Sequence, residues 1–125
     1  MWRPISDSII LIFPYLFITL GTAAFPIYFA GVLISVMNEG IKRIVNSKRP
    51  DGSDNESFPS NHTSLSLLMA IMSGDIIVYF WSGLIAISRF KLKRHRLVDI
   101  VFGAIIAFFF FSFFVQKYLS SFYLV

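Results

Sequence analysis

Three short polar clusters hold residue types that can bind and transfer a phosphoryl group. Histidine can act as a nucleophile or as an acid and base, while lysine and arginine neutralise phosphate oxygens. The first cluster has the spacing K-x6-R-P, the second reads P-S-N-H, and the third has the spacing S-R-x5-H-x3-D. Along the chain, their members are Lys42, Arg49 and Pro50; Pro59, Ser60, Asn61 and His62; Ser88, Arg89, His95 and Asp99. Both histidines of the protein lie in these clusters.

The spacing within the last two clusters places a carboxylate near one histidine and hydrogen-bond donors at a helix start. On a helix, residues four apart share one face, so Asp99 would lie one turn from His95. A carboxylate there can fix the imidazole tautomer and stabilise the imidazolium ion. Ser60 or Asn61 is the expected N-cap of a helix that begins near His62. The hydroxyl and backbone amides of that helix start can donate to an anion.

Taken singly, these residues have simpler interpretations. A lysine or arginine beside an apolar segment more often extends along a membrane interface than binds a substrate. Either histidine could be a hydrogen-bonded interfacial residue with Asp99 as its partner. The basic residues outside the clusters are expected to contact lipid headgroups and set topology; they are Arg43, Lys48, Lys91, Lys93, Arg94 and Arg96.

A metal site is the remaining chemical alternative. The two histidines and the loop acids Asp51, Asp54 and Glu56 could be combined as ligands, but their spacing matches no strong metal signature. We therefore predict neither a metal site nor a cofactor. The chain has no cysteine, which excludes disulfides and thiolate chemistry.

Composition indicates a single-domain integral membrane protein. The 125 residues are 56% hydrophobic and only 14% charged. Uncharged stretches run from Ser8 to Asn38, from His62 to Ser88 with only Asp75 inside, and from Ile100 to Gln116. Such lengths can cross a hydrocarbon layer about 30 Å thick. The net charge is +4, but nine of the eleven Lys and Arg lie in two polar segments between apolar ones, so we predict membrane-flanking charge and no nucleic-acid partner.

The first apolar segment, residues 9–37, predicts one tilted span that is kinked at Pro14, Gly21 and Pro26. Arg3 followed by this run and by Thr22-Ala23-Ala24 loosely resembles a signal peptide. Cleavage there would leave an apolar remnant in the membrane, so we expect the segment to be retained.

The second apolar segment, residues 62–88, predicts a short helical hairpin. Ser73, Gly74 and Asp75 form a turn-like triplet at its middle, where an unpaired aspartate would be costly in a single span. One straight helix would also separate His62 from Arg89 by about 39 Å, so no phosphate could meet both. A final span follows at residues 97–115. We therefore predict an all-α polytopic membrane helix bundle of three to four transmembrane helices, with both termini on the face away from the site.

Together, the three clusters resemble the signature of the type 2 phosphatidic acid phosphatase superfamily, the lipid phosphate phosphatases. The resemblance covers Lys42 to Asp99. It implies a metal-independent hydrolase for a lipid phosphate or a polyprenyl pyrophosphate such as undecaprenyl pyrophosphate. It further implies that His95 becomes a phosphohistidine, that Asp99 orients it, and that His62 is the general acid and then the base. The phosphate-binding residues it implies are Lys42, Arg49, Ser60, Asn61 and Arg89.

The chain departs from that family in three ways. Asn61 stands where glycine is usual, two connecting segments are shorter, and about six helices are usual in membrane members. Two alternatives therefore stay open. One is a catalytically silent relative that binds anionic lipid or serves as a membrane assembly subunit, and the other is a lipid phosphotransferase. Homo-oligomers are compatible with each.

Two arguments about the side of the membrane oppose each other. With nine basic residues flanking the site and only Arg3 and Lys117 at the other end, the positive-inside rule favours a cytoplasmic site. The resemblance instead implies a site on the periplasmic, extracellular or lumenal face. We favour the outward site, in a multi-pass protein of the cell membrane.

Overall fold

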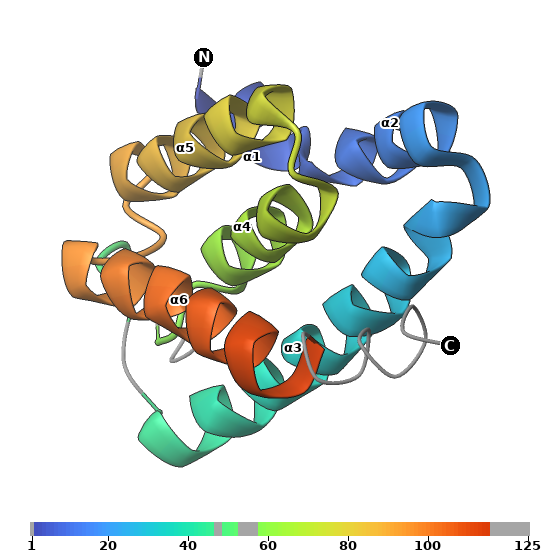
Figure 1. Ribbon diagram of the computed structural model, residues 1–125. Helices are drawn as coiled ribbons and strands as arrows, with labels where there is room; N and C mark the ends of the chain where they lie inside the picture. The colour runs from blue at the N-terminus through green and yellow to red at the C-terminus, as the bar shows by residue number, and fades with distance from the viewer. Residues whose placement is uncertain (1, 47–48, 53–57, 116–125) are drawn as a thin grey trace.

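The computed structural model describes residues 2–46, 49–52 and 58–115, and these residues are all-helical where they have regular structure (Figure 1). This confirms the predicted all-α class. The elements are α1 (Trp2–Asp7), α2 (Ile9–Leu20), the 3₁₀ turn η1 (Gly21–Ala23), α3 (Ala24–Val45), α4 (Asn61–Ser73), α5 (Ile76–Lys91), α6 (Leu97–Phe110) and the π-helical turn η2 (Phe111–Val115).

The predicted hairpin is confirmed, because α4 and α5 are separate helices joined by a two-residue turn. Gly74 ends α4 in the left-handed conformation at φ 65°, which glycine adopts without steric cost. Asp75 then caps α5, accepting a hydrogen bond from the amide of Ile77 at 2.9 Å. Tyr15 of α2 donates its hydroxyl to the same carboxylate at 2.7 Å. The aspartate that made a single span costly therefore has two donors.

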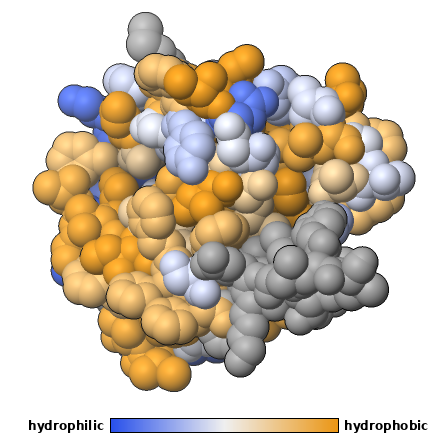
Figure 2. Space-filling view, in the orientation of Figure 1, coloured by the Kyte–Doolittle hydropathy of each residue, from blue (hydrophilic) through white to orange (hydrophobic). Residues whose placement is uncertain are grey.

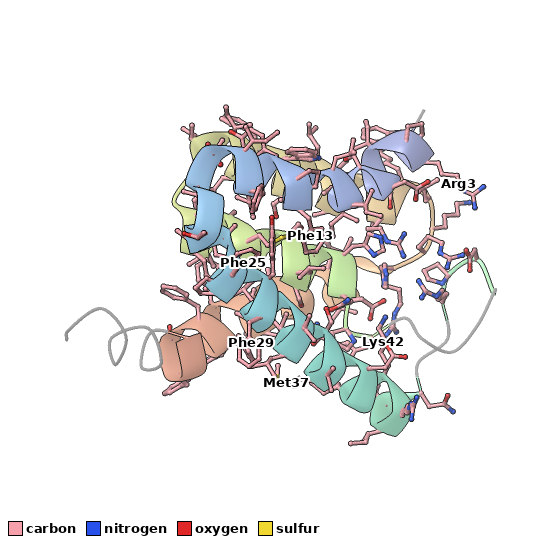
Figure 3. The ribbon with its side chains drawn as sticks, turned by 90° about the vertical axis from the view of Figure 1, so that its right-hand side faces the viewer. Arg3, Phe13, Phe25, Phe29, Met37 and Lys42 are labelled. Carbon is pink, nitrogen blue, oxygen red and sulfur yellow. The ribbon has the colours of Figure 1, made fainter. Side chains whose placement is uncertain are left out.

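The helical run over residues 9–37 was predicted as one kinked span, but the structure divides it at Gly21. The helical run changes direction at Gly21, where φ is 60° and ψ is −131°, a conformation open essentially to glycine. As a result, α2 and α3 form a V, and α3 runs back from the turn at an angle to α2 (Figure 1). Arg3 and Lys42 consequently lie at the same end of the bundle (Figure 3). The prediction that the N-terminus lies away from the site is therefore also wrong.

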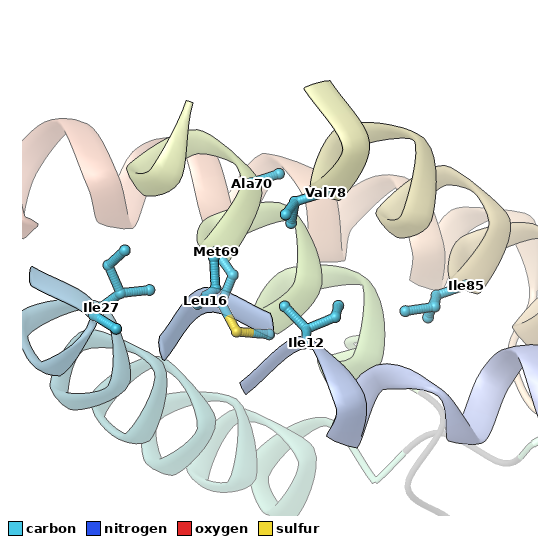
Figure 4. Close-up of a cluster of buried hydrophobic side chains, with 8 residues drawn as sticks. Ile12, Leu16, Ile27, Met69, Ala70, Val78 and Ile85 are labelled. Atoms are coloured by element: carbon cyan, nitrogen blue, oxygen red, sulfur yellow. The ribbon is translucent and has the colours of Figure 1, made fainter. Parts of the chain in front are cut away.

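The hydrophobic core surrounds α4, which lies between the other helices (Figure 1). One buried cluster joins α2, α3, α4 and α5 through Ile12, Leu16, Ile27, Met69 and Val78, with Ala24, Ala70 and Ile85 beside them (Figure 4). A second cluster joins α3, α4 and α6, and contains Ala30, Ile34, Leu68, Ala107 and Phe110. The four outer helices therefore all use α4 as their common packing surface.

A close contact between α4 and α6 brings the third polar cluster to the start of α4. The Ser64 hydroxyl donates to the Gly103 carbonyl at 2.7 Å. A Cβ atom at Gly103 would lie only 2.7 Å from the Ser60 carbonyl oxygen, so the approach requires glycine. The Ser60 amide also donates to the carbonyl of Asp99 at 3.2 Å. These contacts fix the segment around His95 and Asp99 against the N-terminus of α4.

The outer surface is strongly apolar, as the space-filling view shows (Figure 2). Large hydrophobic side chains are exposed on successive helices, including Ile18 of α2, Val36 of α3 and Phe80 of α5. Among the described residues, the run Ile9–Val45 is the one long and apolar enough to pass for a membrane span, and only 17% of its most apolar stretch is buried. Its position near the N-terminus is compatible with a membrane span or a signal sequence. The run Leu97–Phe113 is apolar but shorter.

Candidate active site

A polar pocket of about 500 Å³ opens at the end of the bundle where α1 begins and α3 ends. Five lysines and arginines, two aspartates and one histidine lie among its lining residues, so the pocket is basic. The lining comprises Arg3, Ser6, Asp7, Lys42, Arg49, Asp51, Asn61, His62, Arg89, Leu92 and Arg94. Residues from all three predicted clusters therefore meet at one place, although they are far apart in the sequence.

The structure brings five of the eight predicted site residues to the pocket wall: Lys42, Arg49, Asn61, His62 and Arg89. The other three, His95, Asp99 and Ser60, are buried at 1%, 0% and 0% exposure. They lie immediately behind that wall, as their hydrogen bonds show.

His95 is held between two guanidinium groups. Its Nε2 atom lies 3.3 Å from Nη1 of Arg49 and 3.2 Å from Nη2 of Arg89. Arginine nitrogens only donate, so Nε2 is the acceptor and the proton of the neutral ring belongs on Nδ1. The lone pair of Nε2 thus points to where two arginines would hold phosphate oxygens, which is the geometry that a histidine nucleophile needs.

Both arginines are buried, and Arg89 has one donor without a partner among the described residues. Arg49 is 6% exposed and also donates from Nη1 to the Arg94 carbonyl at 3.2 Å. Arg89 is 8% exposed, donates from Nη1 to Ser6 at 3.1 Å, and has a buried Nε atom without a hydrogen-bond partner among the described residues. An unpaired buried donor costs about 1–3 kcal/mol, and a bound anion would relieve that cost. Burial and the charges of Arg49 and Arg94 lower the pKa of Arg89 to about 10, so it remains a cation at neutral pH.

His62 lies in the first turn of α4, at the pocket end of that helix. Burial lowers its pKa most, and with the positive charges of Arg89, Lys42, Arg49 and Arg94 it brings the pKa to about 3. The imidazole is therefore neutral at neutral pH in the empty pocket. A phosphate dianion would offset the same charges and favour protonation of His62. This environment fits a group that becomes an acid once an anionic substrate is bound.

Asp99 lies in the first turn of α6, and Arg96 is one of its partners. The helix α6 begins at Leu97, so His95 precedes it and the expected one-turn spacing on a helix does not apply. The Asp99 carboxylate accepts from the Arg96 amide at 2.8 Å and from Arg96 Nη2 at 3.0 Å. Arg96, expected among the lipid-headgroup and topology charges, is therefore also a partner of Asp99. Its position three residues before an acid, at a helix start, is the capping-box spacing that could have revealed it.

Ser60 is the N-cap of α4, as predicted, but its side chain does not line the pocket in the described structure. Its hydroxyl lies 3.4 Å from the Thr63 amide and 3.0 Å from the Thr63 hydroxyl. The structure thus assigns Ser60 to the cap and to the contact with α6. A contact between its side chain and phosphate stays a prediction.

Asn61 lines the pocket, but two hydrogen bonds tie its side chain to α3. Its Oδ1 atom accepts from Asn38 at 2.9 Å, and its Nδ2 atom donates to Ser35 at 3.3 Å. The residue that replaces the expected glycine therefore has partners of its own. Sequence reasoning missed Asn38, although a buried amide in an apolar helix is itself unusual.

The N-terminal helix and the α5–α6 connection supply pocket residues that sequence reasoning also missed. Arg3, Ser6 and Asp7 reach the pocket from α1, where positions three and four apart share a face. Arg94 forms an ion pair with Asp51 at 3.5 Å across the pocket rim. Arg94, expected among the lipid-headgroup and topology charges, thus also has a partner within the protein. Within the described residues, no group of three or more potential ligands could hold a metal; Asp54, Glu56 and Lys48 lie outside them.

No protein-family model, curated protein or solved structure matches this chain.

Proposed function

We propose that this chain is a membrane phosphatase of the type 2 phosphatidic acid phosphatase kind, acting on a lipid phosphate or polyprenyl pyrophosphate. One observation carries the proposal: His95 presents Nε2 to Arg49 and Arg89, at 3.3 and 3.2 Å, behind the wall of a basic pocket. Phosphoryl transfer needs mainly positioning and charge neutralisation, and this pocket offers both beside a nucleophilic nitrogen.

In the first half-reaction, Arg49, Arg89 and Lys42 hold the phosphate oxygens while the Nε2 lone pair of His95 attacks phosphorus. The bond from phosphorus to the leaving oxygen breaks, and His62, protonated in the presence of the dianion, gives its proton to that oxygen. In the second half, His62 takes a proton from water. The water oxygen then attacks the phosphohistidine, the N–P bond breaks, and inorganic phosphate leaves.

The apolar surface supports a polytopic membrane arrangement. We place the membrane-crossing parts at residues 9–20, 24–37, 65–73, 76–87 and 98–110, with the pocket outside them at one surface. This gives five crossings rather than three to four, because α2 and α3 cross separately. The α4 helix has 13 residues and is about 20 Å long, so the bilayer would thin around the bundle or the outer helices would tilt.

An apolar groove beside the pocket supports a lipid substrate over a soluble one. The groove has a volume of about 330 Å³ and lies between α2, α3 and α4. It shares Asn61 with the basic pocket, so a phosphorylated headgroup in the pocket can continue into a chain in the groove. Its other lining residues are Phe13, Gly31, Val32, Ser35, Val36, Glu39 and Leu65.

We propose that the pocket faces outward, although the structure places Arg3 with the other basic residues at the pocket end. Arg3, Lys42, Arg49, Arg89 and Arg94 line the pocket, and Arg96 pairs with Asp99, so phosphate chemistry and folding account for them on either face. Among the described residues, the remaining basic residues at this end are Arg43, Lys91 and Lys93. That small excess gives the positive-inside rule little weight.

The test is phosphate release by the purified protein in lipid nanodiscs with a metal chelator present. Phosphatidic acid, phosphatidylglycerophosphate and undecaprenyl pyrophosphate would be offered, with His95→Ala as the matched inactive variant. Release from at least one lipid, absent in that variant, is the expected result. Thermal stabilisation by phosphate without turnover would instead indicate a silent relative, and turnover only with an added acceptor lipid would indicate a phosphotransferase.

A further inference from the structure

The N-terminal helix α1 contacts the guanidinium group that faces the nucleophile. Ser6 of α1 is fully buried, and its hydroxyl accepts a hydrogen bond from Nη1 of Arg89 at 3.1 Å. The other terminal nitrogen of the same group, Nη2, lies 3.2 Å from Nε2 of His95. A guanidinium is rigid and planar, so a contact that fixes one terminal nitrogen also fixes the other.

We propose that Ser6 is a positioning residue of the active site, which holds Arg89 in register with His95. The inference rests on the proposed function. Ser6 does not touch the reacting atoms, and it acts through Arg89. None of the three polar clusters contains it, so it adds a fourth segment of the chain to the site.

Electrostatics explains why Arg89 needs a neutral anchor. Arg49 and Arg94 both repel its positive charge, and they approach it from the pocket side. The opposing attraction comes from Asp7 and Asp51, which are exposed and therefore screened by solvent. A buried hydroxyl supplies a directional contact that neither salt nor a bound anion weakens. Without it, the long Arg89 side chain gains rotamer freedom and leaves its place beside His95.

The inference also gives the N-terminal run a role in catalysis. Trp81 of α5 donates its indole N–H to Ser8 at 2.7 Å, which holds the α1–α2 junction against the helix that carries Arg89. Arg3 and Asp7 line the pocket from the same short helix. Removal of this run as a signal sequence would therefore take one wall of the pocket with it.

The test compares Ser6→Ala with Ser6→Thr, which keeps the hydroxyl, and with Ser82→Ala. Ser82 is a matched control because it is a buried serine on α5 whose hydroxyl lies 3.1 Å from that of Ser66, away from the pocket lining. We expect Ser6→Ala to lower kcat for phosphatidic acid about tenfold, with a smaller change in KM, as for loss of one hydrogen bond in the transition state. Ser6→Thr should recover most of the rate. Equal kcat values in Ser6→Ala and Ser82→Ala would overturn the inference.

A second measurement separates this inference from failure of the proposed function. Thermal unfolding midpoints of Ser6→Ala, Arg89→Gln and the double variant form a cycle that needs no turnover. We expect the double variant to be less destabilised than the sum of the single changes. Additive shifts would overturn the Ser6–Arg89 contact even if the enzyme is active. A coupled pair in a protein that binds no inorganic phosphate and releases none would instead refute the proposed function alone.

Discussion

Nη2 of Arg89 lies 3.2 Å from Nε2 of His95, so the nitrogen assigned as nucleophile is an acceptor of a buried cation. Arg49 makes the equivalent contact at 3.3 Å. In the proposed mechanism, an anion between the two arginines would let each exchange its hydrogen bond to Nε2 for one to a phosphate oxygen. The same exchange would free the Nε2 lone pair for attack, so binding and activation would be coupled through one pair of side chains.

His95→Ala is expected to abolish turnover, because it removes the atom that bonds to phosphorus. Brief incubation with ³²P-labelled substrate followed by denaturation should trap an acid-labile, base-stable phosphoenzyme in the wild-type protein and no label in the variant. Asp99→Asn should retain both a residual rate and some label. Full labelling of His95→Ala would place the nucleophile elsewhere.

Arg49→Lys is expected to lower kcat/KM by about ten- to hundredfold, the equivalent of about 1–3 kcal/mol. Nη1 of Arg49 contacts the Arg94 carbonyl and His95, and in the proposed site the planar guanidinium also holds two phosphate oxygens in one fork, which an ammonium group cannot reproduce. Arg43→Lys is the matched control, because Arg43 is exposed and does not line the pocket. Activity assays of both variants test the difference, and equal activities would contradict the predicted role of Arg49.

His62 is expected to make the empty protein less stable in acid. The unfolded chain binds a proton near pH 6.5, whereas folded His62 remains neutral until about pH 3. As the pH falls below 6.5, proton uptake therefore favours the unfolded state, and this contribution to the free energy of unfolding falls by about 1 kcal/mol per pH unit. Unfolding in phosphate-free buffer between pH 4 and 7 should show a shallower pH dependence in His62→Gln. The same pH dependence of unfolding in the wild-type protein and in His62→Gln would contradict the burial of a neutral imidazole at this position.

Gly103→Ala is expected to destabilise the protein by about 1–3 kcal/mol and to reduce activity. The added Cβ would meet the Ser60 carbonyl oxygen at 2.7 Å, which forces α6 away from α4 and moves the segment around His95. Gly83→Ala is the control, because a Cβ there has nothing within 4 Å and alanine favours a helix. Thermal unfolding and phosphate release should separate the two variants. If Gly103→Ala matches Gly83→Ala in both, the close contact does not position the site.

Single cysteines in this cysteine-free chain test both the fold-back at Gly21 and the side of the membrane. Lys91 is at the pocket end of α5, and Thr22 is at the turn between α2 and α3, and both are exposed. An outward pocket predicts that a membrane-impermeant thiol reagent labels Lys91→Cys on intact cells and leaves Thr22→Cys unlabelled. The reverse pattern would place the pocket in the cytoplasm. Arg3→Cys should behave like Lys91→Cys if the N-terminus shares the pocket end.

The turn between α4 and α5 and the start of α4 could be predicted from the sequence. The turn at Asp75 followed from the cost of an aspartate inside a single span, and the convergence of Lys42, His62 and Arg89 followed from that turn. The helix start at Ser60 was also readable, because a serine before an apolar run is a common N-cap.

Other parts depend on geometry that the sequence does not carry. The sequence around Gly21 is compatible with a kink in one helix and with a reversal between two helices. The direction of α3 and the positions of Arg3 and Ser6 could therefore not be predicted. The start of α6 at Leu97 likewise moved His95 off the helix. The contact between Arg96 and Asp99 also depends on where this helix begins, which the spacing alone does not give.

The turn between α4 and α5 supplies the hydrogen bonds that an ionised side chain otherwise draws from water. The Asp75 carboxylate accepts hydrogen bonds from a backbone amide of its own helix and from the Tyr15 hydroxyl, so protein groups replace water at this turn. In the proposed membrane, such a tip can lie at the far surface of a locally thinned bilayer. A hairpin with arms of 13 and 16 residues could therefore complete its two crossings there, and a short central helix would suffice to hold the proposed phosphate site at the opposite surface.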